Sequence, residues 1–248
     1  MRYVGLVVTD GPQPPEAVAE MNRRFPAFLE AIESRGVQYL GRELEFPEDG
    51  ATVRVRDGEK LVTDGPFAET KEFVGGFDLL ECADLVEAIE LESLSPVAPF
   101  LAIEIRPFRA EPRLGPNIAA FGGGDDSKGI PYLLMAWARQ ATGVEGAALR
   151  ACDAWRRELE ARGAFILGGE LCGPQTAKTL RCRDGDIQAH DGTFLDVGDF
   201  LVAIDVVRSA DRQEAIEVAA THPLAGCYAI EVRPCWSNAA HEGTEPHA

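Results

Sequence analysis

The sequence predicts an α+β protein built from two copies of one small module, packed sheet against sheet. A shift of 127 residues aligns residues 35–107 with residues 162–234 without a gap, and 30 of the 73 aligned positions are identical. Both halves also alternate strand-like and helical segments in the same order. A sheet covered by helices on one face leaves its other face apolar, and two copies can cover both such faces.

The first copy has the order of a ferredoxin-like module, namely strand, helix, strand, hairpin, strand, helix and strand. A β-branched run over 3–9 predicts the first strand, and an apolar stripe over 16–35 predicts the first helix. Pro26 lies inside this stripe, so we expect a kink or a break there. The later elements are strands 37–46, 51–63 and 73–82, a helix capped by Asp84 and ending near Leu94, and strand 101–107; the dipeptide Asp57-Gly58 marks the hairpin turn.

The second copy repeats this order, with helices over 145–163 and 211–220. We therefore expect a first module over 1–108, a second over 131–236, and a flexible polar tail over 237–248. The segment 109–130 is rich in glycine and proline, a composition typical of a flexible linker rather than a packed element.

Charge and composition exclude several classes of partner. The formal net charge of −17 would repel the phosphates of nucleic acid. No apolar run approaches the ~18 residues that span a bilayer, and we expect no signal peptide, because Met1-Arg2-Tyr3 leads directly into the first predicted strand. The six cysteines show no zinc-like spacing, and no glycine-rich nucleotide motif is present. We expect a cytoplasmic protein with free thiols, no metal and no cofactor.

The most distinctive stretch runs from Thr63 to Glu72, reads TDGPFAETKE, and is followed by Gly75-Gly76-Phe77. It resembles the DGPF signature of the YCII-related family, and the resemblance continues to the closing Glu-Ile-Arg-Pro of residues 104–107. It covers nearly all of the first copy and, more weakly, the second. Members of this family pair ferredoxin-like modules into a dimeric α+β barrel. The resemblance therefore implies an internal pseudo-dimer, and leaves a further homodimer open.

The DGPF stretch also supplies the candidate ligand-binding residues. Its aspartate can bond backbone N–H groups and simply close a turn. Alternatively, clustered carboxylates can raise one another's pKa and leave a group suited to acid–base chemistry, with Asp64 as the catalytic candidate. The candidates in the first copy are Asp64, Phe67, Glu69, Lys71 and Glu72.

The second copy keeps the aspartate as Asp191, a further ligand-binding candidate. It replaces Pro66 with Thr193 and Lys71 with Gly198. The turn-forming residues persist while the charged ones change. If the loop forms a binding site, the two sites are therefore unequal, and the first is the better candidate.

Family resemblance also implies a catalytic dyad, a histidine on the first helix and an aspartate before a proline after the second helix. These positions are occupied by Phe25 and Ser95 in the first copy, and by Cys152 and His222 in the second. The inherited dyad is absent, which argues against the lyase or dehydrochlorinase chemistry of the family. Cys152 and His222 could form a nucleophile–base pair, but helical spacing places Cys152 on the stripe that faces the sheet. His222 is kept as a ligand-binding candidate.

These observations favour a small-molecule binding or accessory module without turnover. The alternative is a small lyase- or isomerase-type enzyme that uses the DGPF-loop carboxylates for acid–base chemistry. A third reading is an interaction module that acts through its acidic surface.

Overall fold

The computed structural model describes residues 1–67, 71–139, 146–194 and 199–236, and they form two antiparallel sheets. The first copy contributes β1 (Arg2–Thr9), β2 (Gln38–Glu43), β3 (Ala51–Arg56), β4 (Glu59–Asp64), β5 (Phe73–Glu81) and β6 (Ala102–Pro107). The second contributes β8 (Ile130–Arg139), β9 (Phe165–Glu170), β10 (Lys178–Arg183), β11 (Asp186–Asp191), β12 (Asp199–Ser209) and β13 (Ala229–Pro234), and β7 (Arg113–Leu114) lies between the copies.

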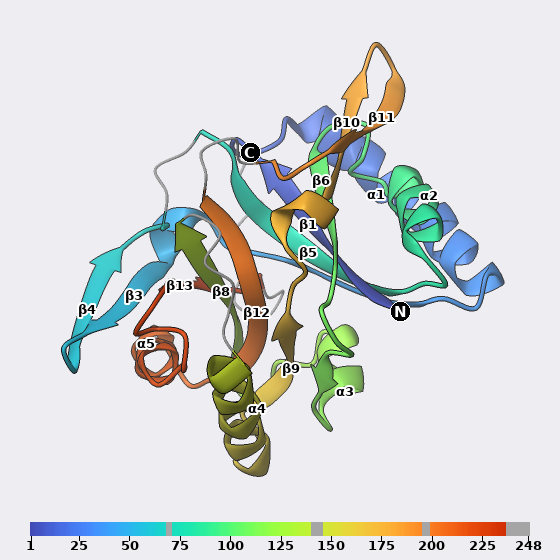
Figure 1. Ribbon diagram of the computed structural model, residues 1–248. Coiled ribbons are helices and arrows are strands. Elements are labelled where there is room, and N and C mark those ends of the chain that lie inside the picture. Colours follow the sequence, from blue (N-terminus) through green and yellow to red (C-terminus); the bar gives the residue numbers. More distant parts are fainter. Residues whose placement is uncertain (68–70, 140–145, 195–198, 237–248) are drawn as a thin grey trace.

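The two sheets pack face to face, and helices cover their outer faces (Figure 1). The first sheet has the order β11-β10-β6-β1-β5-β2, and the second β4-β3-β13-β8-β12-β9-β7. Helices α1 (Pro15–Ser34) and α2 (Leu85–Leu94) cover the first sheet; α4 (Gly146–Ala161) and α5 (Arg212–Ala220) cover the second. The predicted fold, two ferredoxin-like modules in an intramolecular dimeric α+β barrel, is confirmed.

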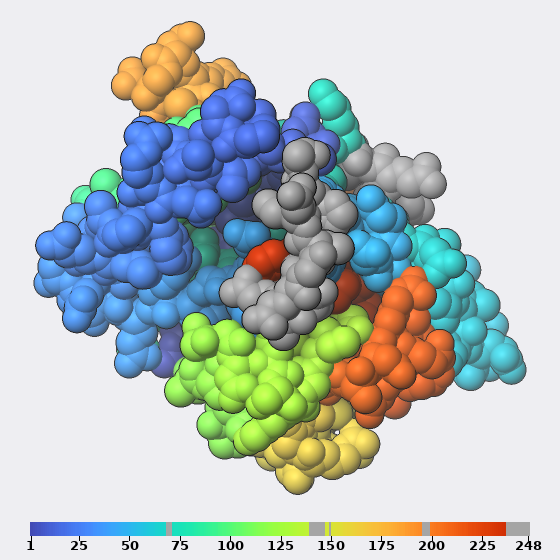
Figure 2. Space-filling view, turned by 180° about the vertical axis from the view of Figure 1, so that it is seen from behind, coloured from blue at the N-terminus to red at the C-terminus, as the bar shows by residue number. Residues whose placement is uncertain are grey.

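The copies exchange their hairpins. Strand β3 of the first copy pairs with β13 of the second, with Thr52 opposite Glu231. Strand β10 of the second copy pairs with β6 of the first, with Thr179 opposite Glu104. Figures 1 and 2 show each hairpin lying beside the helices of the other copy. Sequence periodicity could not predict this exchange, because β6 and β13 offer nearly the same Ile-Glu-x-Arg-Pro edge to either hairpin.

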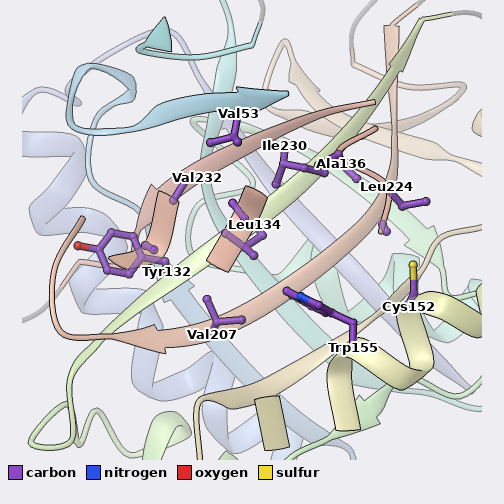
Figure 3. Packing of buried hydrophobic residues seen from close by; sticks show 14 of the residues in the cluster. Val53, Tyr132, Leu134, Ala136, Cys152, Trp155, Val207, Leu224, Ile230 and Val232 are labelled. Atoms are coloured by element: carbon purple, nitrogen blue, oxygen red, sulfur yellow. The ribbon is translucent and has the colours of Figure 1, made fainter. Parts of the chain in front are cut away.

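Val53 shows what the exchange does to the core. This residue of the first-copy hairpin is fully buried against Ile230 and Val232 of the second copy, in a cluster that also holds Trp155 of α4 (Figure 3). A separate cluster fills the space between the sheets and draws residues from both copies. Neither copy therefore completes its core alone.

Local signals located the turns and caps correctly. Asp57 and Gly58 have φ values of 53° and 81°, the left-handed conformation that a tight hairpin requires. The carboxylate of Asp84 accepts a hydrogen bond from Glu87 N–H at 3.0 Å and caps α2, as predicted. Helix α1 runs unbroken through Pro26, so the expected break does not occur.

The expectation of a flexible, unpacked linker over 109–130 is wrong. Strand β7 pairs with β9, and the short helix α3 (Ile118–Gly122) buries Phe121 completely. The Phe121 ring stacks on Phe77 with centroids 6.5 Å apart. A few apolar residues among the glycines and prolines are enough to anchor the segment. The predicted tail, 237–248, lies outside the described residues.

Candidate functional site

The DGPF loop, residues Asp64–Phe67, turns away from the end of β4. Gly65 has φ +88°, a conformation that disfavours any side chain. Its N–H donates to the carbonyl of Gly50 at 3.2 Å, and its own carbonyl accepts from the Thr52 hydroxyl at 3.1 Å. These bonds fix the loop to the exchanged hairpin, so the aspartate–glycine turn is a structural requirement of this site.

The end of the loop contacts the second copy. Phe67 N–H donates to the Glu231 carboxylate at 3.3 Å. The Phe67 ring stacks on Trp137 with centroids 5.9 Å apart, and the Arg54 guanidinium lies 5.3 Å from its centroid. The signature motif of one copy thus recognises residues of the other copy.

Glu231 and Arg233 form a buried ion pair beneath this loop, with nitrogen and oxygen 3.2 Å apart. Arg233 also donates to the carbonyl of Glu45. Burial raises the pKa of Glu231, and the charge of Arg233 and the Phe67 N–H oppose that shift. Burial likewise lowers the pKa of Arg233, so each charge depends on the other.

The second copy repeats this arrangement in the other direction. Phe194 N–H donates to Glu104 at 2.9 Å, and Glu104 pairs with Arg106 at 3.1 Å. Both of these charged side chains are buried. The contact between a DGxF loop and an opposing Glu-x-Arg strand is therefore built twice.

A pocket of about 620 Å³ opens beside the first-copy loop. Its walls are mostly apolar or aromatic, with Glu48, Asp64 and Lys71 as charged groups; the lining residues are Gly11, Pro12, Phe46, Pro47, Glu48, Asp64, Gly65, Pro66, Lys71 and Phe73. The rings of Phe46 and Phe73 meet edge to face at 6.3 Å. This volume is typical of a small-ligand site.

Family membership follows from comparison with known domains. The family model of the YCII-related domain matches residues 1–109 and again residues 130–237. The chain belongs to the YCII-related family. Both matches in this YCII-related protein coincide with the two copies of the repeat, and residues 110–129, which hold β7 and α3, lie between them.

The similar proteins do not establish an activity for the YCII-related protein. An uncharacterized protein of Rhizobium meliloti (strain 1021) is 49% identical over 59 residues, which are 23% of this chain and 48% of that relative. The chain therefore matches about half the length of that relative. The crystal structure of a candidate chlorite dismutase covers 95% of both chains at 8% identity and TM-score 0.39. That of an anthrone oxidase-like protein covers 95% of this chain and 91% of its own, at 8% identity and TM-score 0.36.

In the YCII-related chain, the described charged candidates of the first-copy DGPF stretch, Asp64, Lys71 and Glu72, are paired. Asp64 is 87% exposed and accepts from Arg212 at 2.6 Å. Lys71 lies 3.7 Å from Asp10. Glu72 is held by two bonds of 2.8 Å from Arg181 of the exchanged hairpin, and those bonds hold its pKa below the usual range. Glu69 lies outside the described residues.

The second-copy candidates lie in two separate places. Asp191 ends β11 on the surface and pairs with Lys178, whose hydrogen bond lowers the pKa of Asp191. His222 is buried behind the second sheet. Its Nε2 lies 3.1 Å from Asp205, and its Nδ1 accepts from Leu224 N–H at 3.1 Å. Both ring nitrogens are thus engaged, and neither is left as a base for Cys152.

Cys152 belongs to the same buried region as His222. Burial raises the pKa of its thiol to about 12, so the neutral thiol prevails. The residues at the first-copy dyad positions do not form an acid–base pair: Phe25 is exposed on α1, and Ser95 is buried at the end of α2.

Within the described part of the chain, no group of three His, Cys, Asp or Glu side chains could hold a metal ion. No helix among these residues is long and apolar enough to cross a membrane.

Sequence reasoning missed the second-copy half of the site, namely Trp137, Glu231 and Arg233. The signal was present, because both copies keep a charged Glu-x-Arg pair inside an otherwise apolar closing strand. In a strand, residues two apart share a face, so a repeated pair of opposite charges there indicates a buried ion pair.

Proposed function

We propose that this YCII-related chain binds a small, largely apolar ring-bearing molecule at the first-copy DGPF loop. The observation that carries the proposal is the pocket of about 620 Å³ with its aromatic corner of Phe46 and Phe73. Aromatic walls with a few polar groups are the usual composition of small-ligand sites. An edge-to-face corner can accept a third ring without rearranging.

Several features favour the first copy over the second as the binding half. The second copy has Gly173 where the first has Phe46, and Gly198 where the first has Lys71. It therefore lacks one aromatic wall and the lysine. Phe200, the counterpart of Phe73, remains and offers a matched control.

Binding without turnover is supported by the state of the polar groups. Asp64 is exposed and paired with Arg212, and Glu72 is held by Arg181. An acid–base catalyst needs a pKa near the working pH and a free path to the substrate. Glu231 has a raised pKa, but its two oxygens serve Phe67 and Arg233. We also propose a cytoplasmic location, consistent with six free cysteines, which cell fractionation would test.

The test uses benzoate, benzylamine and benzyl alcohol as probes, since they share a benzene ring and carry a negative charge, a positive charge and no charge, respectively. Ligand-observed NMR should detect binding of at least one. We expect Phe73→Ala to weaken that binding about tenfold or more, equivalent to ~1.4 kcal/mol, and Phe200→Ala to leave it unchanged. Lack of binding by all three probes, or equal weakening in both variants, would exclude a ring-binding site here. Unfolding curves of both variants control for folding.

A further inference from the structure

Two buried carboxylates lie between α2 and the first sheet, apart from the pocket. Asp78 of β5 is 6% exposed, and Glu92 of α2 is fully buried. The hydroxyl of Tyr39 donates to Asp78 at 2.7 Å. Neither oxygen of Glu92 has a hydrogen-bond partner in the described part of the chain. Burying a carboxyl group without a partner costs much more free energy when the group is charged than when it is neutral.

Among the described residues, no positively charged side chain pairs with either carboxylate. Strand β2 presents Tyr39 and the solvent-exposed Glu43. Cys82, which follows β5, presents its thiol. The N-terminal ammonium lies nearby and donates to the backbone carbonyl of Cys82 at 2.8 Å. Helix α1 contributes apolar Phe28 and Ile32, and β6 and β10 contribute apolar residues of the same core. Strand β1 contributes Tyr3, whose hydroxyl donates to the sulfur of Met1 at 3.4 Å. Gly5 of β1 is so close that a Cβ there would meet Glu92.

In the second copy, the same strand aspartate is neutralised. Asp205, the counterpart of Asp78, accepts two bonds from Arg156, at 2.6 and 3.1 Å, and contacts His222. Leu29 occupies the position of Arg156 in the first copy, and Glu92 replaces Ala219. At equivalent places in the fold, the first copy therefore lacks the cation of the second copy and carries one acid more.

We propose that Asp78 and Glu92 form a proton-dependent latch between α2 and the first sheet. The helix stays docked while the pair holds a proton, and it loosens when both carboxylates are charged. Two like charges in a dry interior repel strongly, and moving α2 is the direct way to hydrate Glu92. Helix α1 restrains this movement weakly, because only Ala17, Phe28 and Ile32 of its residues are buried.

The pKa shifts agree with this direction. Burial raises the pKa of Asp78 to about 6, and burial and the neighbouring Asp78 raise that of Glu92 well above its usual value. The folded state thus binds protons more tightly than the unfolded state. The stability that this binding contributes is complete below the ordinary carboxyl pKa and is lost as pH rises through about 6 and beyond.

Amide hydrogen exchange of residues 85–94 tests the latch, with α5 of the same molecule as internal control. After correction for intrinsic exchange, protection of α2 relative to α5 should fall about tenfold or more between about pH 6 and about pH 8. Glu92→Gln keeps the shape without the charge and should abolish the fall. Glu92→Ala, which places the residue of the second copy at this position, should abolish it as well.

Constant relative protection of α2 in the unmodified chain would overturn the proposal, as would an undiminished fall in Glu92→Gln. Glu92→Ala carries neither the charge nor the shape of the acid and matches Ala219 of the second copy. This variant decides the question if Glu92→Gln does not fold: an undiminished fall in its relative protection refutes the latch.

Discussion

The side chain of Glu231 uses one oxygen to bind the other copy and the second to bind its own strand. One accepts from Phe67 N–H of the first-copy loop, and the other from Arg233 of its own strand. Glu104 and Arg106 repeat the arrangement. A buried ion pair contributes little net stability beyond an apolar pair of similar size, but the loss of one partner is costly. Its effect here is to fix where the DGPF loop sits.

Glu231→Leu tests that dependence. We expect a loss of about 3–5 kcal/mol in the free energy of unfolding, because Arg233 would remain buried without a counter-charge. Adding Arg233→Met should recover most of that loss, since no charge then remains. Urea unfolding followed by tryptophan fluorescence gives both values. A single-variant loss below about 1 kcal/mol would mean that water already reaches Arg233.

At the scale of the elements, the sequence predicted whatever depends on neighbours along the chain. The Asp57-Gly58 turn and the Asp84 cap are set by a few adjacent residues, and both were located correctly. The strand with which each hairpin pairs was not predicted, because β6 and β13 fit the sequence pattern of either hairpin equally well. The site divides in the same way: the motif marked the DGPF loop, whereas Glu231 lies in a strand that the fold alone brings there.

Gly65→Ala should distinguish the role of the DGPF loop as a structural turn from its role as a wall of the pocket. A side chain at φ +88° costs roughly 1–2 kcal/mol of stability, so the loop should shift and deform the pocket wall that Gly65 lines. Gly192→Ala, at φ +102°, places the same strain in the second copy and serves as control. We expect similar losses of stability in thermal unfolding, but weaker binding of the aromatic probe only in Gly65→Ala. Equal probe binding in both variants would dissociate the loop from the pocket.

For the whole molecule, the hairpin exchange makes each copy depend on the other. The first-copy hairpin covers β13 and the core beneath α5, and the second-copy hairpin covers β6. Because both copies lie in one chain, their association cannot be lost by dilution, and each can diverge without breaking it. The unequal DGPF loops, and the different neutralisation of Asp78 and Asp205, are divergences of this kind.

A fragment of residues 1–108 would lack the strand on which its hairpin docks, and its own β6 would be left uncovered. Since β6 and β13 carry nearly the same edge, the hairpin of one fragment can pair with β6 of a second. We therefore expect a two-fold dimer by light scattering, with a melting temperature that rises with concentration. Val53→Asp places a charge at the buried centre of this contact and should abolish dimerisation. If the unsubstituted fragment and its Val53→Asp variant were both well-folded monomers, each module could pair its hairpin with its own closing strand. The exchange would then result from joining the copies in one chain and not from an incomplete core.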